Sequence, residues 1–390
     1  MPGPLSGVIV VELPHELTAW AGKLMADLGA DVILVEPPGG SPQRTWGPFL
    51  DDEPGPERSL WWWHHHTSKR SVVLDRDVAE DEERLDRLVA GADVVLAAAP
   101  LADARARWAA TNPGLVTVSV IAPDTATDLT ILAGGGPVWM CGYDDHTLPP
   151  VRGGGNQGFQ TAGHWAVIGT LVALVHREVA GEGQHLDVSA HAAASVTTES
   201  GSHGYLICGV EATRQTGRHA SATPSLPTQL RCADGRYVNS GTGARTGAEF
   251  RRFLDWLEAL GLRDQFDGSV FLEMGAERDR ITAKDLQDPL VQQMVVSVRE
   301  AQQFVSTRVS AYDFFISAQQ HGLTAGVVYA PEDVFSDPHF VARQWPVDVE
   351  HPELGRSFTY PGRPYRLTAT PWQITRRAPL LGEDQAMLDR

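Results

Sequence analysis

Lysine and cysteine are both scarce in this 390-residue chain, and each scarcity excludes a class of site. Of the 32 basic residues, only Lys23, Lys69 and Lys284 are lysines. The 3 cysteines lie far apart and form no C-x-x-C pair. This spacing excludes a disulfide framework and a cysteine-based zinc site.

The chain also lacks a surplus of positive charge and a long apolar run. It has 49 acidic against 32 basic residues, a net charge of −17, which argues against coating nucleic acid or an anionic membrane. Its longest apolar run, residues 165–175, is shorter than the roughly 20 residues that span a bilayer. The N-terminus has no basic segment followed by a long apolar stretch, so we expect a cytoplasmic protein without nucleic-acid or membrane partners.

Common cofactor and nucleophile motifs are missing as well. The first predicted strand is followed by ELPHELTAW, without G-x-G-x-x-G, and the chain contains neither a P-loop nor G-x-S-x-G. The run WWWHHH at 61–66 places three histidines side by side. Because consecutive side chains do not converge on one point, we interpret this run as an aromatic surface or interface patch and predict no metal site.

What the chain does contain is a regular alternation of strands and helices. Short runs rich in Val, Ile and Leu predict strands at 8–13, 31–36, 71–74, 93–96 and 115–121. Helical patterns lie between them, at 18–28, 80–90 and 102–110. This rhythm predicts an α/β fold with a doubly wound, mainly parallel sheet.

The second half of the chain predicts a buried helix at 163–180, a strand at 185–189 and a helix at 190–207. The polar segment 215–228 is expected to be a loop or domain junction. A small strand (237–240) and three helices (248–260, 290–309 and 312–321) follow, and the chain ends in short strands and turns.

One loop carries candidate acid/base residues. Asp144, Asp145 and His146 are adjacent in a Gly/Pro-rich segment, which is either a solvated loop or a site of general acid/base chemistry. Without further information, the residues indicate only a soluble α/β protein of unknown ligand.

Seven segments in order resemble the family III CoA transferases, which include formyl-CoA transferase, carnitine CoA-transferase and the 2-methylacyl-CoA racemases. They are 19–40, 68–75, 88–95, 162–189, 321–329, 337–345 and 351–356. The resemblance implies a large α/β domain formed by 1–215 and 326–390, a smaller α+β domain at 216–325, and an interlocked dimer. It also implies coenzyme A or an acyl-CoA as substrate, with no tightly bound cofactor.

The family's transferases use an aspartate as nucleophile, four residues before the glycine that opens the buried helix. That glycine corresponds to Gly163, so the aspartate position holds Phe159, which can neither attack a thioester nor hold a proton. The racemase histidine falls near Thr127 and is also absent. The resemblance therefore predicts no catalytic residue at these positions.

The family's coenzyme A contacts are also largely absent. Its I-K-V-E-R-P pattern reads ILVEPP here, with Leu34 and Pro37, and its E-N-F-x-P-G pattern reads as alanines at 97–99 before Pro100. Lys69 is the one cationic contact that the resemblance carries over, and its alternative is a surface lysine before a strand.

Three functions follow from this pattern. The favoured one is the non-catalytic subunit of a heteromeric acyl-CoA transferase, paired with a homologous aspartate-bearing chain. The second is a self-sufficient transferase or racemase, a homodimer with chemistry relocated to Asp128, Asp144, Asp145, His146 or His164. The third is a non-enzymatic binding or scaffold protein.

Overall fold

The computed structural model describes residues 2–241 and 243–389. The chain divides into two compact units, each with its own core. Unit 1 consists of Met1–Gly142, Pro149–Glu211 and Phe335–Arg390, and unit 2 of Tyr143–Leu148 and Ala212–Val334. The main boundaries thus fall after Glu211 and Val334, whereas the sequence placed them after residues 215 and 325.

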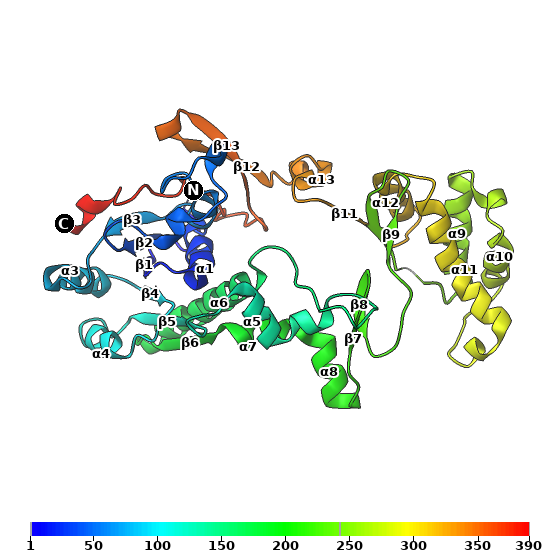
Figure 1. The fold of residues 1–390 in the computed structure, drawn as a ribbon, viewed down its shortest axis with the longest axis horizontal. Helices are drawn as coiled ribbons and strands as arrows, with labels where there is room; N and C mark the ends of the chain where they lie inside the picture. The colour runs from blue at the N-terminus through cyan, green and yellow to red at the C-terminus, as the bar shows by residue number, and fades with distance from the viewer. Residues whose placement is uncertain (1, 242, 390) are drawn as a thin grey trace. The chain divides into compact units, whose positions relative to one another are not determined.

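A six-stranded parallel sheet forms the centre of unit 1, in the order β3-β2-β1-β4-β5-β6 (Figure 1). Its strands are β1 (Ile9–Glu12), β2 (Asp31–Glu36), β3 (Arg70–Val73), β4 (Val94–Ala97), β5 (Val116–Ile121) and β6 (His185–Ser189). The predicted α/β class is confirmed, with additional small antiparallel sheets elsewhere in the chain.

Helices cover both faces of this sheet. One core combines sheet residues with α1 (Glu16–Asp27), α5 (Asp128–Gly135), α6 (Gln157–Ala180) and α7 (Ala190–Ser195). The core on the other face includes Leu85 and Val89 of α3 (Ala79–Ala90) and Trp108 of α4 (Ala102–Thr111). Apolar side chains on both faces explain why the strand sequences do not alternate. Helix α8 (Glu199–Cys208) follows α7.

Helix α6 begins earlier than its apolar pattern predicts. It starts at Gln157 instead of residue 163, because Asp128 accepts a hydrogen bond from the Gly158 amide at 2.7 Å and satisfies a backbone donor of the first turn. Within the described residues, α6 is long and apolar enough to cross a membrane, yet 50% of its most apolar window is buried inside unit 1. This burial is typical of a core helix.

The C-terminal part of unit 1 adds α13 (Pro338–Ala342) and a hairpin of β12 (Pro346–His351) and β13 (Arg356–Pro361). This hairpin packs onto the short helix α2 (Leu60–His65) through Trp63, Val349, Phe358 and Tyr360. The hairpin therefore brings residues near the end of the chain against residues near its beginning.

Unit 2 is built around a core of its own, which includes Phe250, Phe253, Trp256 and Phe314. A three-stranded antiparallel sheet joins β9 (Gln229–Arg231), β10 (Tyr237–Asn239) and β11 (Gly326–Val328). Its helices are α9 (Gly247–Ala259), α10 (Ser269–Ala276), α11 (Pro289–Ser306) and α12 (Ala311–Gln320).

The expectation of a loop over 215–228 is wrong in part. Strands β7 (Thr213–Gln215) and β8 (Arg218–Ser221) form a hairpin there. Gly217 adopts a φ of +64° in the connecting turn, a conformation that glycine reaches without strain. The polar composition concealed a short strand pair that buries few apolar side chains.

Candidate active site at the start of helix α6

The sheet order identifies one edge of unit 1 as the place for a ligand. Strands β1 and β4 are neighbours, and the chain winds outward from them in opposite directions. In open α/β sheets, ligands bind outside the carboxyl ends of the strands at such a switch point. Glu16 opens α1 just after β1, and β4 ends at Ala97, where the family's coenzyme A contacts are replaced by alanines.

Helices α1 and α6 run side by side in the same direction. Asn156, just before α6, donates a hydrogen bond from Nδ2 to Glu16 Oε1 at 3.1 Å, and Trp20 Nε1 donates to His164 Nε2 at 3.3 Å. A Cβ on Gly163 would lie 3.0 Å from Trp20 Cδ1, so glycine permits this close approach. The first turn of α6 therefore lies level with the first turn of α1.

Phe159 lies in this first turn and belongs to the core. Its side chain is 4% exposed and packs in the same cluster as Leu17 of α1 and Ile131 and Leu132 of α5. The position to which the resemblance assigns the nucleophile is thus filled by a buried ring. A side chain with this packing offers no polar atom to a thioester.

Asp128 is fully occupied in holding the start of α6. Its Oδ1 accepts from the Gly158 amide, and its Oδ2 accepts from Arg152 Nη1 at 2.9 Å. Arg152 also donates to the carbonyl oxygens of Gly153 and Gly155, which orders the glycine-rich segment before the helix. Asp128 therefore has a structural role in this conformation.

Glu16 is the carboxylate that the sequence did not single out. It is partly buried, and its burial together with the negative charge of Asp128 raises its pKa to about 7. A carboxyl group that titrates near neutral pH suits proton transfer or nucleophilic attack. The only sequence signal was an acidic residue after a predicted strand, which also fits an ordinary helix start.

The structure places Asp144, Asp145 and His146 in unit 2, where each is engaged locally. Arg218 makes two hydrogen bonds to the Asp144 carboxylate, at 2.8 and 3.1 Å, and lowers its pKa. Hydrogen bonds from Thr147 lower the pKa of Asp145, and His146 Nε2 lies 3.1 Å from the Arg214 carbonyl oxygen. In these contacts the two carboxylates and the imidazole each bond to other residues, and not to one another as an acid/base pair would.

Lys69 is completely buried, so its interpretation as a surface lysine is wrong. Its Nζ lies 2.8 Å from Glu12 Oε2 and 3.1 Å from His66 Nδ1, and it donates to the Ala19 carbonyl at 3.0 Å. Burial lowers the pKa of Lys69, and the ion pair with Glu12 opposes that change. All three ammonium hydrogens thus have protein partners in this conformation.

Most of the WWWHHH run is buried within unit 1, so its interpretation as a surface patch is wrong, and the alternative of an interface patch stays a prediction. Residues 61–65 lie in α2 and His66 is its C-cap, and Trp62, Trp63, His65 and His66 are buried. Ser59 caps the helix, accepting from the Trp62 amide at 3.1 Å, and the tryptophans pack against Leu34 of β2 and the β12–β13 hairpin. In the part of the chain that the structure describes, no group of three His, Cys, Asp or Glu side chains could hold a metal ion.

Comparison with known proteins gives one consistent family. The model of CoA-transferase family III matches residues 5–385, in agreement with the resemblance. The chain is 27% identical to succinyl-CoA:(R)-benzylsuccinate CoA-transferase subunit BbsE of Thauera aromatica, covering 96% of this chain and 90% of the relative. It is 30% identical to succinyl-CoA–D-citramalate CoA-transferase of Chloroflexus aurantiacus, covering 98% and 92%. A CaiB/BaiF family protein of Brucella suis has a similar structure, with a TM-score of 0.76 and 25% identity over 100% of this chain and 99% of that one.

Proposed function

Because the chain belongs to CoA-transferase family III, we propose that it is the non-catalytic subunit of a heteromeric acyl-CoA transferase that moves CoA between carboxylic acids. In this proposal a homologous chain supplies the nucleophilic aspartate. The enzyme works in the cytoplasm and takes coenzyme A thioesters as substrates, with no tightly bound cofactor. Both relatives are named for succinyl-CoA, so succinyl-CoA is the donor to test first.

The burial of Phe159 carries this proposal. An aspartate nucleophile must meet the thioester carbonyl, and Phe159 instead contributes to the core between α1, α5 and α6. The cationic family contact Lys69 remains a predicted coenzyme A ligand, and it would have to exchange one of its present partners for a phosphate. Because position 159 offers no nucleophile, we propose that a partner chain supplies the aspartate needed for transfer.

An exposed apolar face on α6 supports association with a second chain. Trp165, Ile168, Val172, Val175 and Val179 recur at spacings of three and four residues and are between 41% and 87% exposed. No Asp, Glu, Lys or Arg occurs from 157 to 176, although 21% of the chain is charged. The opposite face of α6 is already packed in the core, so this second apolar stripe is typical of a protein–protein contact.

The test is to co-express this chain with a homologous family III chain that has an aspartate four residues before the corresponding glycine. We expect a complex on gel filtration that transfers CoA from succinyl-CoA to an acceptor acid, whereas this chain alone does not. Replacing the partner's aspartate with asparagine should abolish activity, and Phe159→Leu in this chain should preserve it. Exchange by the isolated chain would contradict the proposal.

Glu16 favours one alternative, a self-sufficient transferase. In that case its carboxylate oxygen attacks the thioester carbonyl carbon, and the C–S bond breaks to release CoA thiolate and leave a mixed anhydride. The thiolate then attacks the Glu16 carbonyl carbon and displaces the donor acid, giving a glutamyl-CoA thioester. The raised pKa of Glu16, about 7, accompanies greater basicity of the attacking carboxylate.

Trapping separates the two functions without steady-state assays. The isolated chain is incubated with succinyl-CoA and hydroxylamine, which converts a glutamyl thioester or anhydride into a hydroxamate, and its peptides are analysed by mass spectrometry. The non-catalytic role predicts an unmodified Glu16 peptide. A hydroxamate on Glu16 that disappears in Glu16→Gln would establish the self-sufficient transferase.

A further inference from the structure

A small cavity lies between α2 and the β12–β13 hairpin, outside the site described above. Its volume is about 290 Å³. The lining residues are Leu50, Leu60, Trp63, His64, Phe358, Thr359, Tyr360 and Pro361, all in unit 1. None of them carries a formal charge when His64 is neutral. This size and composition match a pocket for one small apolar group.

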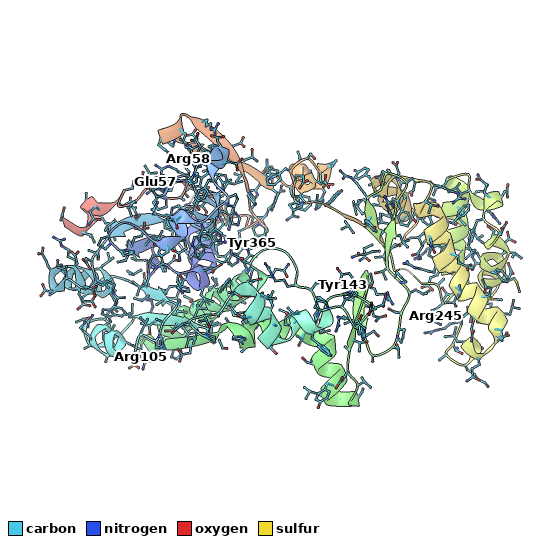
Figure 2. The ribbon with its side chains drawn as sticks, viewed as in Figure 1. Glu57, Arg58, Arg105, Tyr143, Arg245 and Tyr365 are labelled. Carbon is cyan, nitrogen blue, oxygen red and sulfur yellow. The ribbon has the colours of Figure 1, made fainter. Side chains whose placement is uncertain are left out.

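The aromatic walls of the cavity are held in place by polar contacts of their own. Trp63 Nε1 donates to the Glu57 carbonyl at 3.0 Å, in the segment that Figure 2 labels at Glu57 and Arg58. Phe358 packs edge-on against Trp63, with ring centroids 5.1 Å apart. The Tyr360 hydroxyl lies 2.9 Å from Nε2 of the buried His351, so it already has a hydrogen-bond partner within the protein. These walls therefore present mainly carbon to an occupant.

His64 is the polar group of this cavity that lacks a hydrogen-bond partner. Within the described residues neither of its ring nitrogens has a protein partner, and its ring stacks on Trp20 at 5.9 Å with an interplanar angle of 22°. Burial and the charge of Lys23 lower its pKa to about 4, so the imidazole is neutral at pH 7. A neutral imidazole retains one N–H donor and one acceptor nitrogen.

The cavity connects to the start of α6 through aromatic contacts. His64 stacks on Trp20, and Trp20 donates to His164, which lies five residues after Phe159 on α6. Trp20 therefore links His64, in the wall of the cavity, to the N-terminal half of α6.

We propose that this cavity binds the uncharged apolar part of an acyl group, an aryl or branched alkyl chain, with His64 donating a hydrogen bond to its carbonyl oxygen. The lining contains no cation, so a free carboxylate would enter without a counter-charge. In a thioester with an apolar tail, the carbonyl oxygen can accept the hydrogen bond from His64, and the tail can pack against the apolar walls. The link to CoA transfer rests on the proposed function, whereas the binding itself does not.

Truncated thioesters test the binding independently of coenzyme A. The full chain is titrated by calorimetry with S-(3-phenylpropanoyl)-N-acetylcysteamine and with its S-acetyl analogue. We expect the phenylpropanoyl compound to bind about tenfold more tightly, because burying a phenyl ring removes apolar surface from water. Thr359→Trp and Leu60→Trp, which fill the cavity from opposite sides, should each remove this preference.

Two further variants separate the hydrogen bond from the packing. His64→Phe keeps a ring against Trp20 but removes the hydrogen-bond donor, so it should lower the affinity for both thioesters several-fold. Val341→Trp adds the same bulk at an exposed valine elsewhere in unit 1 and should leave both affinities unchanged. Thermal unfolding checks that each variant is folded. If Leu60→Trp does not fold, Thr359→Trp still tests the effect of filling the cavity.

Three results would overturn the proposal. Equal affinity for the two thioesters would show that the cavity does not select an apolar tail. A preference that survives Thr359→Trp would place the binding elsewhere. Loss of binding when an associated partner chain is added would show that a protein segment occupies the cavity in the assembled enzyme. None of these results depends on whether the chain has transferase activity.

Discussion

At the scale of single residues, the structure distinguishes positions 159 and 16 by how readily each can hold a carboxylate. Position 159 is closed, because its phenyl ring is 4% exposed and surrounded by aliphatic side chains. Position 16 is partly open, and its carboxyl group has Asn156 as a hydrogen-bond donor and Asp128 as a negative neighbour. A carboxylate therefore costs much more at 159 than at 16.

Phe159→Asp tests whether restoring the family's aspartate restores activity. We expect no acyl exchange and a loss of about 3–5 kcal/mol of unfolding free energy, because the core loses a ring and gains a carboxyl group. Burial should raise the pKa of the new carboxyl, so the loss should be larger at pH 8 than at pH 5. Urea unfolding and exchange of labelled succinate measure both effects.

The control is Phe159→Leu, which keeps the site apolar and should cost less than about 1.5 kcal/mol. Exchange activity in Phe159→Asp at wild-type stability would contradict this account. That result would mean that the first turn of α6 opens to substrate.

Glu16→Gln should flatten the pH dependence of stability between about pH 4.5 and 7. The pKa of Glu16 rises from 4.5 to about 7 on folding, so over this interval the unfolded state ionises while the folded state keeps its proton. Stability contributed by this group is thus full below pH 4.5 and is lost as the pH rises through 7. Urea unfolding at several pH values measures the slope.

Glu53→Gln is the matched control, since the Glu53 side chain is 72% exposed. It should leave the slope unchanged. Identical slopes for Glu16→Gln and the wild type would refute the raised pKa and weaken the case for relocated chemistry at Glu16.

At the scale of elements, a buried ion pair decides how α1 packs. Glu12 of β1 and Lys69 before β3 are both fully buried, with Glu12 Oε2 and Lys69 Nζ 2.8 Å apart. Gly22 of α1 faces this pair, and a Cβ there would overlap with Glu12 Oε2 and lie 2.7 Å from Lys69 Nζ. The absence of a side chain at 22 therefore allows the helix to lie directly over the ion pair.

Gly22→Ala consequently should destabilise the protein by about 3 kcal/mol, the cost of disturbing a buried ion pair. Helix propensity alone gives the opposite sign, because Ala is favoured over Gly inside a helix by about 1 kcal/mol. Denaturant unfolding decides between these signs. Gly91→Ala, whose Cβ would meet only Leu88 O at 3.8 Å, should change stability by less than about 0.5 kcal/mol.

The elements that were predicted well from the sequence are those whose buried face is set by the spacing of apolar residues within the element itself. Strand β2 matches its predicted range of 31–36, and α3 begins within one residue of its prediction. The start of α6 was missed because its cap, Asp128, lies 30 residues before Gly158. Helix α2 was missed because its tryptophans are buried by a hairpin more than 280 residues later in the chain, which no local pattern reveals.

The candidate site shows the same division. The replacement at Phe159 could be identified from one family segment, since only the spacing to Gly163 was needed. Glu16 could not, because its raised pKa depends on burial and on the negative charge of Asp128, and both arise only in the folded chain. The burial of Lys69 likewise depends on Glu12, 57 positions earlier, and on the carbonyl of Ala19.

At the scale of the whole molecule, the exposed stripe on α6 is the feature that an isolated chain leaves unexplained. Its five apolar side chains extend from Trp165 to Val179 on a helix whose other face is fixed in the core of unit 1. Contiguous exposed apolar surface of this kind marks an interaction site. The interlocked dimer stays a prediction, and the stripe is where association with a second chain can be tested.

Val172→Glu places a charge in the middle of the stripe. We expect the affinity for the second chain to fall at least about tenfold, because the interface would then have to bury an unpaired carboxylate. Sedimentation velocity over a concentration series measures the association, and circular dichroism should show unchanged folding because Val172 is 64% exposed. Val78→Glu, at another exposed valine of unit 1, should associate as the wild type does. If the Val172→Glu chain associates with wild-type affinity, the stripe lies outside the interface, and the partner must contact another surface.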